Sequence, residues 1–180
     1  MIVLPDAWST RLGFTSLEDE RMRAVLPELG GRVLDIGAGQ NRLVRLHGDG
    51  VGVDVVDWGS GATVVEDTRH LPFDDASFDT VAFIACLNHI PYRDEALVEA
   101  RRVLKPGGRL VATMIGRLIG DIGHKIWWYS EDKHREVAEG EVMGMDPHDM
   151  MSLLTGAGYI EIQHRRFLYR LNHLFVAKKP

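Results

Sequence analysis

The stretch that most constrains the fold is Val33–Asn41, which reads Val-Leu-Asp-Ile-Gly-Ala-Gly-Gln-Asn. Its first four residues form an apolar run interrupted by Asp35, which predicts a short buried strand with a carboxylate near its end. Gly37 and Gly39 then favour a turn, because glycine permits positive φ and leaves the backbone bare. A strand that leads through such a turn into a helix builds a nucleotide-binding corner, since free helix N–H groups and loop backbone face one small space. The stretch therefore predicts an α/β protein with a ligand site at this strand's end.

The rest of the chain alternates strand and helix patterns. Further strands are predicted at residues 51–55, 62–66, 78–85, 109–115, 159–166 and 169–177, and helices at 17–29, 42–47, 94–104 and 147–155. Asp94 is expected to cap the third of these helices. The alternation implies right-handed crossovers and a mostly parallel sheet. The last two strands are joined by too few residues for a crossover, so they must pair antiparallel.

Length, charge and cysteine content narrow the class of protein. The 180 residues suit one domain with a substantial core. A net charge of -5 argues against a general nucleic-acid-binding surface. Cys86 is the single cysteine, which excludes an internal disulfide and favours a reducing compartment, the cytoplasm. We see no signal-peptide pattern and no apolar run that could span a bilayer, and the eight histidines lack metal-ligand spacing, so no metal is expected.

Carboxylates recur at the predicted strand ends, where ligands of open parallel sheets bind. Asp54 ends the strand beside the glycine turn and could accept both hydroxyls of a ribose in charge-assisted hydrogen bonds. Asp67, after the next strand, could reach an adenine amino group. Each acid has a structural alternative. Asp35 could bond backbone N–H groups of its own loop, Asp54 could cap a turn, and Asp67 could simply be solvated.

The glycine turn also discriminates between cofactors. A dinucleotide fingerprint reads Gly-x-Gly-x-x-Gly, whereas Arg42 stands here at the position of the last glycine. No Walker lysine follows a glycine-rich loop either. The turn therefore favours a nucleoside without phosphates over a phosphate cradle, and a nicotinamide oxidoreductase is disfavoured.

Four segments, in this order, resemble the motifs of class I S-adenosylmethionine-dependent methyltransferases: 33–39, 51–54, 66–79 and 102–110. The resemblance implies a Rossmann-like three-layer α/β sandwich, with a seven-stranded, mostly parallel sheet and an antiparallel C-terminal hairpin strand. It implies one methyltransferase domain over residues 1–180, with S-adenosylmethionine as cofactor.

The resemblance also implies where the cofactor binds. Asp35 and the glycine loop would hold the methionine part, Asp54 the ribose, Asp67 with Thr68 the adenine, and Ala85 with Cys86 the sulfonium side. The full set of implied cofactor residues is Asp35, Gly37, Ala38, Gly39, Asn41, Asp54, Val55, Asp67, Thr68, Ala85 and Cys86. Two features depart from the family pattern. Asn41 replaces a third glycine, although asparagine tolerates left-handed conformations. The short connection between the second and third strands makes Asp57 a competitor of Asp54 for the ribose.

Methyl transfer from a sulfonium needs mainly alignment in a dry pocket, because the donor is already activated. His89 is the candidate general base, with capping or packing as an equally supported alternative. Residues 116–144, which contain Trp127, Trp128 and Tyr129, are expected to form a lid over a small-molecule acceptor. The alternative, equally supported, is a locally buried aromatic cluster or a subunit contact. The alternative to a methyltransferase is a non-catalytic S-adenosylmethionine-binding module or regulatory subunit.

Overall fold

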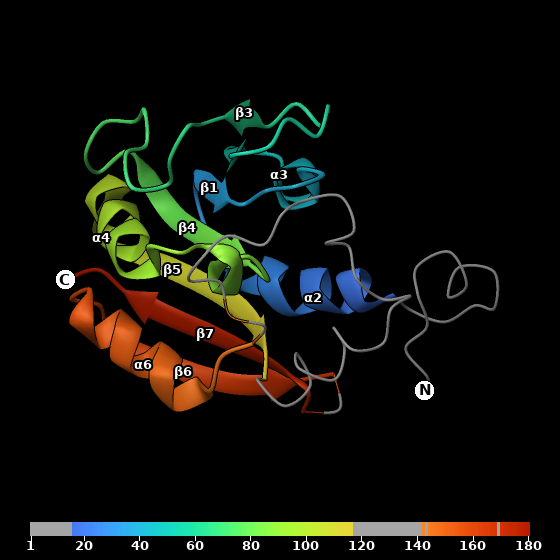
Figure 1. Cartoon of the computed structure of the whole chain (residues 1–180), viewed down its shortest axis with the longest axis vertical. Coiled ribbons are helices and arrows are strands. Elements are labelled where there is room, and N and C mark those ends of the chain that lie inside the picture. The colour runs from blue at the N-terminus through green and yellow to red at the C-terminus, as the bar shows by residue number, and fades with distance from the viewer. Residues whose placement is uncertain (1–15, 117–141, 143, 169) are drawn as a thin grey trace.

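The computed structural model describes residues 16–116, 142, 144–168 and 170–180. Within them the chain forms a seven-stranded sheet in the order β3-β2-β1-β4-β5-β7-β6 (Figure 1). The strands are β1 (Val33–Ile36), β2 (Gly50–Asp54), β3 (Thr63–Val64), β4 (Phe78–Ile84), β5 (Leu104–Ile115), β6 (Ile160–Phe167) and β7 (Asn172–Lys178). The helices are α2 (Leu17–Val25), α3 (Arg42–His47), α4 (Arg93–Val103) and α6 (Pro147–Gly156), with the short 3-10 turns η1 (Leu26–Glu28) and η2 (Leu87–His89).

The direction of the strands confirms the predicted topology. Neighbours from β3 through β2, β1 and β4 to β5 all pair parallel. β7 runs antiparallel to β5, and β6 pairs antiparallel with β7. The carboxyl ends of the five parallel strands therefore share one edge of the sheet, where a ligand site is expected.

Helices cover both faces of the sheet, which confirms the three-layer sandwich. Figure 1 shows α4 and α6 to one side of the strands and α2 and α3 to the other. The first pair packs on a core that includes Leu97, Met150, Phe83 and Phe175. The second pair packs on a separate core, made of Met22, Val25, Val33, Leu43, Ala82, Val111 and Leu174. Central strands contribute to both cores because alternate side chains point to opposite faces.

Several element boundaries differ from the prediction, each for a local reason. The first helix ends at Val25 and continues only as a 3-10 turn, since Pro27 lacks the N–H that an α-helix requires. The prediction that Asp94 caps α4 is wrong, because Tyr92 is the N-cap. Asp94 lies in the first turn, where its negative charge interacts favourably with the positive end of the helix dipole. β5 begins at Leu104 rather than near residue 109, because Leu104 pairs with Phe78 across a register shift. β3 is shorter than predicted and spans only Thr63–Val64.

Among the described residues, no helix is long and apolar enough to cross a membrane.

Candidate active site

Three parallel strands bring the predicted motifs to one corner of the sheet. The N–H groups of Gly37 and Ala38 both donate to Val53 O of the neighbouring strand, at 2.9 and 3.0 Å. These bonds tie the glycine loop after β1 to the end of β2. Just after β4, the Cys86 thiol donates to Ile36 O, with the sulfur 2.9 Å from the oxygen. The ends of β1, β2 and β4 thus meet, and the loop lies between them.

Gly37 is required at this meeting point. Its φ is +74°, in the region that favours glycine, and a Cβ added there would lie 2.7 Å from Cys86 Cβ and 2.8 Å from its Sγ. No side chain fits without displacing the end of β4. The glycine therefore allows two strand ends to approach each other closely.

Asp54 lies buried at the end of β2, at 9% exposure. Its Oδ2 accepts a hydrogen bond from Gly39 N at 2.8 Å, and its Oδ1 accepts one from Val56 N at 3.0 Å. The turn-capping alternative is thus partly realised, but an ionised carboxylate offers about four acceptor sites, so two remain. Asp57, in contrast, is exposed, and it accepts a hydrogen bond from Gly59 N at 2.8 Å. Val55, which follows Asp54, is exposed.

Asp35 lies in β1, within the same corner. It is 3% exposed, and its Oδ1 is buried with no hydrogen-bond partner among the described residues. Burial, followed by the nearby charge of Asp54, raises the pKa of Asp35 to about 8. The alternative that this oxygen simply bonds the N–H groups of its own loop is therefore not what the structure shows. A cation that entered the corner would stabilise the charged form of this carboxyl.

Asn41, which replaces a glycine of the family motif, adopts the backbone conformation expected of it. Asn41 adopts φ 55° and ψ 32°, a left-handed conformation, directly before α3. The sequence reasoning missed Ser60, whose hydroxyl donates to Gly39 O at 2.7 Å and braces the loop from the β2–β3 connection. Ser60 stands between Gly59 and Gly61, a pattern typical of a turn, and nothing in that pattern indicates the partner of its hydroxyl.

The acid after β3 is held by a neighbouring cation rather than by solvent. Arg69 donates to Asp67 through its Nε at 2.6 Å and through its backbone N at 2.8 Å. The side-chain hydrogen bond from Arg69 is the main reason that the pKa of Asp67 is lowered. Thr68, next to it, is buried. This loop is distinct from the glycine corner and reaches the same edge of the sheet from β3.

At the end of β4 the backbone turns sharply. Ala85 has φ 56°, and its N–H lies 3.1 Å from both the carbonyl and the hydroxyl oxygen of Thr113, a residue that the motifs did not single out. His89 follows in η2 and is partly buried, with its Nε2 3.1 Å from Asn88 Nδ2. Asn88 also exchanges hydrogen bonds with the backbone of Val142.

The predicted acceptor residues Trp127, Trp128 and Tyr129 lie outside the described residues, as does most of the expected lid.

A separate cavity of about 1110 Å³ lies beside α4 and α6. Its lining includes Arg69, Arg93, Glu95, Val98 and Leu153, but none of the acids or glycines of the corner. The cavity is therefore distinct from the glycine corner, although Arg69 brings it next to the loop after β3. No cluster of three or more metal-ligating side chains occurs in the described part of the chain.

The sheet order, the glycine corner and the strand-end acids define a class I S-adenosylmethionine-dependent methyltransferase domain. The chain belongs to the methyltransferase domain family, whose model matches residues 22–112, just over half of the sequence. The sequence prediction of this family is thereby confirmed, and the non-catalytic alternative is not favoured.

Curated relatives that match this chain include UbiE methyltransferases from several bacteria. The ubiquinone/menaquinone biosynthesis C-methyltransferase UbiE of Azotobacter vinelandii is 27% identical over 188 residues, which cover 84% of this chain and 74% of that protein. The UbiE protein of Bordetella avium is 30% identical over 112 residues, covering 54% of this chain and 44% of the relative. Against the Bordetella relatives, the match thus spans less than half of their length.

Among solved structures, a SAM-dependent methyltransferase from Thermotoga maritima superposes with a TM-score of 0.73. The two are 21% identical, and the match covers 97% of this chain and 94% of the other. At this identity the likeness establishes the fold.

Proposed function

We propose that this chain transfers the methyl group of S-adenosylmethionine to a small-molecule acceptor and releases S-adenosylhomocysteine. The observation that carries the proposal is the corner itself. There Asp35 has a buried oxygen without a partner among the described residues, and it lies beside a second buried acid and a bare glycine loop. Such a corner suits a cationic ligand that carries a nucleoside. Membership of the methyltransferase domain family supports the same conclusion.

The residues of the corner suit the parts of the cofactor. Asp35 and the loop from Gly37 to Asn41 would hold its methionine part. Asp54 would accept the ribose hydroxyls with the lone pairs that Gly39 and Val56 leave free. Val55 offers an exposed apolar side chain beside that position, and Asp67 with Thr68 would bind the adenine from the next loop.

S-adenosylmethionine, when bound, supplies an activated methyl group, so the chain must mainly align the acceptor and exclude water. Ala85 and Cys86 would line the methyl side of the site. Burial, together with the charges of Asp35 and Asp54, raises the pKa of the Cys86 thiol well above its usual range. A thiol kept protonated is a poor nucleophile, so Cys86 does not compete with the acceptor for the methyl group.

His89 is the proposed general base for an acceptor that must lose a proton. Its Nε2 lies against the amide nitrogen of Asn88 at 3.1 Å, so acting as a base requires the acceptor to replace this contact. The residues from 116 to 144, with Trp127, Trp128 and Tyr129, remain the proposed lid over the acceptor. The cytoplasm remains the proposed compartment, because the chain has a single cysteine.

The test is transfer of a labelled methyl group from S-adenosylmethionine by the purified protein, with a panel of acceptors. The names of the curated relatives make precursors of ubiquinone and menaquinone the first acceptors to try. Methylated product with the wild-type chain, and none with a Gly37→Val variant, is expected. Tight cofactor binding without turnover on any acceptor would instead favour the non-catalytic module.

A further inference from the structure

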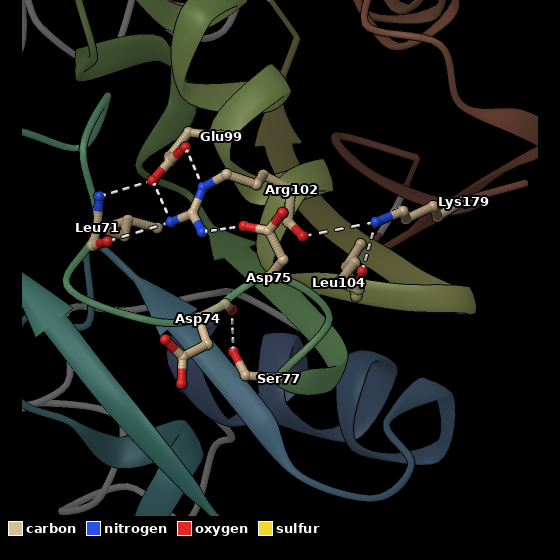
Figure 2. A network of polar contacts seen from close by, with 8 residues as sticks. All are labelled: Leu71, Asp74, Asp75, Ser77, Glu99, Arg102, Leu104 and Lys179. Carbon is tan, nitrogen blue, oxygen red and sulfur yellow. Dashed lines mark hydrogen bonds and ion pairs between the residues drawn. The ribbon is translucent and has the colours of Figure 1, made fainter.

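Two side chains of α4 hold the backbone of Leu71 from both sides. Glu99 Oε1 accepts a hydrogen bond from Leu71 N at 2.8 Å, and Arg102 Nη2 donates to Leu71 O at 3.2 Å. Figure 2 shows both contacts converging on this one peptide segment. We call Glu99, Arg102 and the Leu71 backbone the Leu71 clamp.

The two side chains of the clamp also hold each other. Arg102 Nε donates to Glu99 Oε2 at 2.8 Å, and Arg102 Nη2 donates to Oε1 at 2.7 Å (Figure 2). This is the bidentate geometry in which Arg–carboxylate pairs are strongest, and a spacing of three residues places both on one face of the helix. Burial opposes the charged form of Glu99, but the hydrogen bonds from Arg102 and Leu71 outweigh it and lower the pKa of this carboxyl.

The strand before the loop that contains Leu71 is short, and Arg69 within the loop also contacts α4, through Glu95 Oε2 at 3.4 Å. β3, which precedes the loop, has two residues, both exposed, and two register pairs with β2. α4, by contrast, is fixed to the sheet by Leu97, Ala100 and Val103, all fully buried. The side chain of Leu71 is itself buried in the same core. The position of the loop is therefore determined by α4 more than by β3.

That loop carries the proposed adenine contacts. Asp67 and Thr68 precede Leu71 by four and three residues, and His70 N donates to Asp67 O at 3.3 Å, which closes a turn between them. Because the turn is short, fixing the Leu71 peptide limits where the Asp67 side chain and the Thr68 backbone can lie.

We propose that Glu99 and Arg102 are positioning residues, which hold the Asp67–Thr68 loop in the conformation that recognises the adenine base of the cofactor. The proposal rests on the proposed function, since it requires that the nucleoside of S-adenosylmethionine bind at this edge. It predicts that the clamp affects base discrimination and not only stability.

The experiment measures the affinity of two ligands by calorimetry. S-adenosylhomocysteine carries the adenine amino group, whereas S-inosylhomocysteine has an oxygen in its place. The wild-type chain should bind the first at least tenfold more tightly. Glu99→Leu, which removes the acceptor for Leu71 N at similar size, should weaken S-adenosylhomocysteine binding about tenfold and bring the ratio of the two affinities towards one.

Two control variants separate positioning from loss of charge. Glu99→Gln keeps an oxygen that can accept from Leu71 N and should retain most of the discrimination. Asp75→Asn weakens another partner of the same guanidinium, which contacts Asp75 Oδ1 at 2.6 Å, but leaves Leu71 untouched and should bind both ligands as wild type does. Arg102→Lys, which loses the fork that reaches Leu71 O, should reduce discrimination if Glu99→Leu proves too unstable to purify.

The outcomes are distinct. A Glu99→Leu or Arg102→Lys protein that melts at a lower temperature but keeps the wild-type ratio would show a purely structural clamp and overturn the proposal. A wild-type protein that binds both ligands equally would also overturn it, because there would be no adenine recognition to position. Failure of the wild type to bind S-adenosylhomocysteine at all would instead refute the proposed function.

Discussion

The glycine corner and the loop after β3 serve the same proposed ligand, yet they are built in different ways. The corner is held by the ends of its own strands: two loop N–H groups donate to Val53 O, Gly37 has a positive φ, and the Asp54 carboxylate accepts from Gly39 N. The loop after β3 is held by side chains from a helix, through the ion pair of Glu99 and Arg102 on the Leu71 peptide.

The difference shows two solutions to one requirement. A site for a charged nucleoside needs fixed polar groups at a sheet edge, and the paired central strands β1 and β2 supply Asp35 and Asp54 directly. Where the strand is as short as β3, a neighbouring rigid element, here α4, must fix the position of the loop instead. The close approach at Gly37 tolerates few substitutions, whereas the Leu71 clamp can be weakened one contact at a time. The variants below test this contrast, from the largest expected effect to the smallest.

Gly37→Val should abolish cofactor binding. The new side chain would collide with Cys86, and a β-branched residue is strained at φ +74°. Calorimetry with S-adenosylhomocysteine measures the loss. The matched control is Gly59→Val, at φ +64°. No atom of the described residues lies within 4 Å of a Cβ added there, so this variant carries similar backbone strain without the collision. Unchanged affinity in Gly37→Val would mean that this loop does not surround the methionine part.

Asp54→Ala should weaken S-adenosylhomocysteine binding by roughly ten- to a hundredfold or more. Hydrogen bonds to charged groups are worth about 1.5–3 kcal/mol each, and Gly39 N also loses its acceptor. Asp57→Ala, which removes an exposed carboxylate bonded only to Gly59 N among the described contacts, should bind like wild type. The reverse pattern would assign the ribose to Asp57.

Asp35→Asn should change how stability depends on pH in the ligand-free protein. The pKa of Asp35 is about 8 when folded, against 3.8 for a free side chain, so the folded state holds one more proton between these values. Its stabilising contribution is complete below pH 3.8 and is lost as pH rises towards 8, by about 1.4 kcal/mol per pH unit. Urea unfolding from pH 5 to 8 should show this slope in wild type and its loss in Asp35→Asn. Parallel curves for the two proteins would contradict a protonated Asp35.

Ser60→Ala should have the smallest effect. It removes one neutral hydrogen bond, from the hydroxyl to Gly39 O, worth about 0.5–1.5 kcal/mol. The affinity for S-adenosylhomocysteine should fall roughly two- to tenfold. Ser77→Ala offers a matched control, because its hydroxyl donates to Asp74 O at 2.7 Å in a turn outside the corner (Figure 2). Equal affinity in the two variants would show that the loop does not depend on this brace.

Much of the fold was determined by local sequence patterns. The apolar runs fixed the order of strands and helices, and the short link before β7 fixed its antiparallel direction, because no crossover fits between two strands so close in sequence. The glycines and strand-end acids marked the corner, since the conformation of Gly37 and the end position of Asp54 depend on nearby residues.

Contacts between distant segments were decided only by the tertiary structure. Gly52 reads as an ordinary strand residue, yet the amide oxygen of Asn41 occupies the space that its Cβ would take. Glu99 and Arg102 read as an exposed helical pair, but their partner lies 28 residues before Glu99. The raised pKa of Asp35 depends on its burial and on Asp54 from another strand. Each of these properties arises from which groups the packed sheet brings together, and no spacing within one segment encodes that.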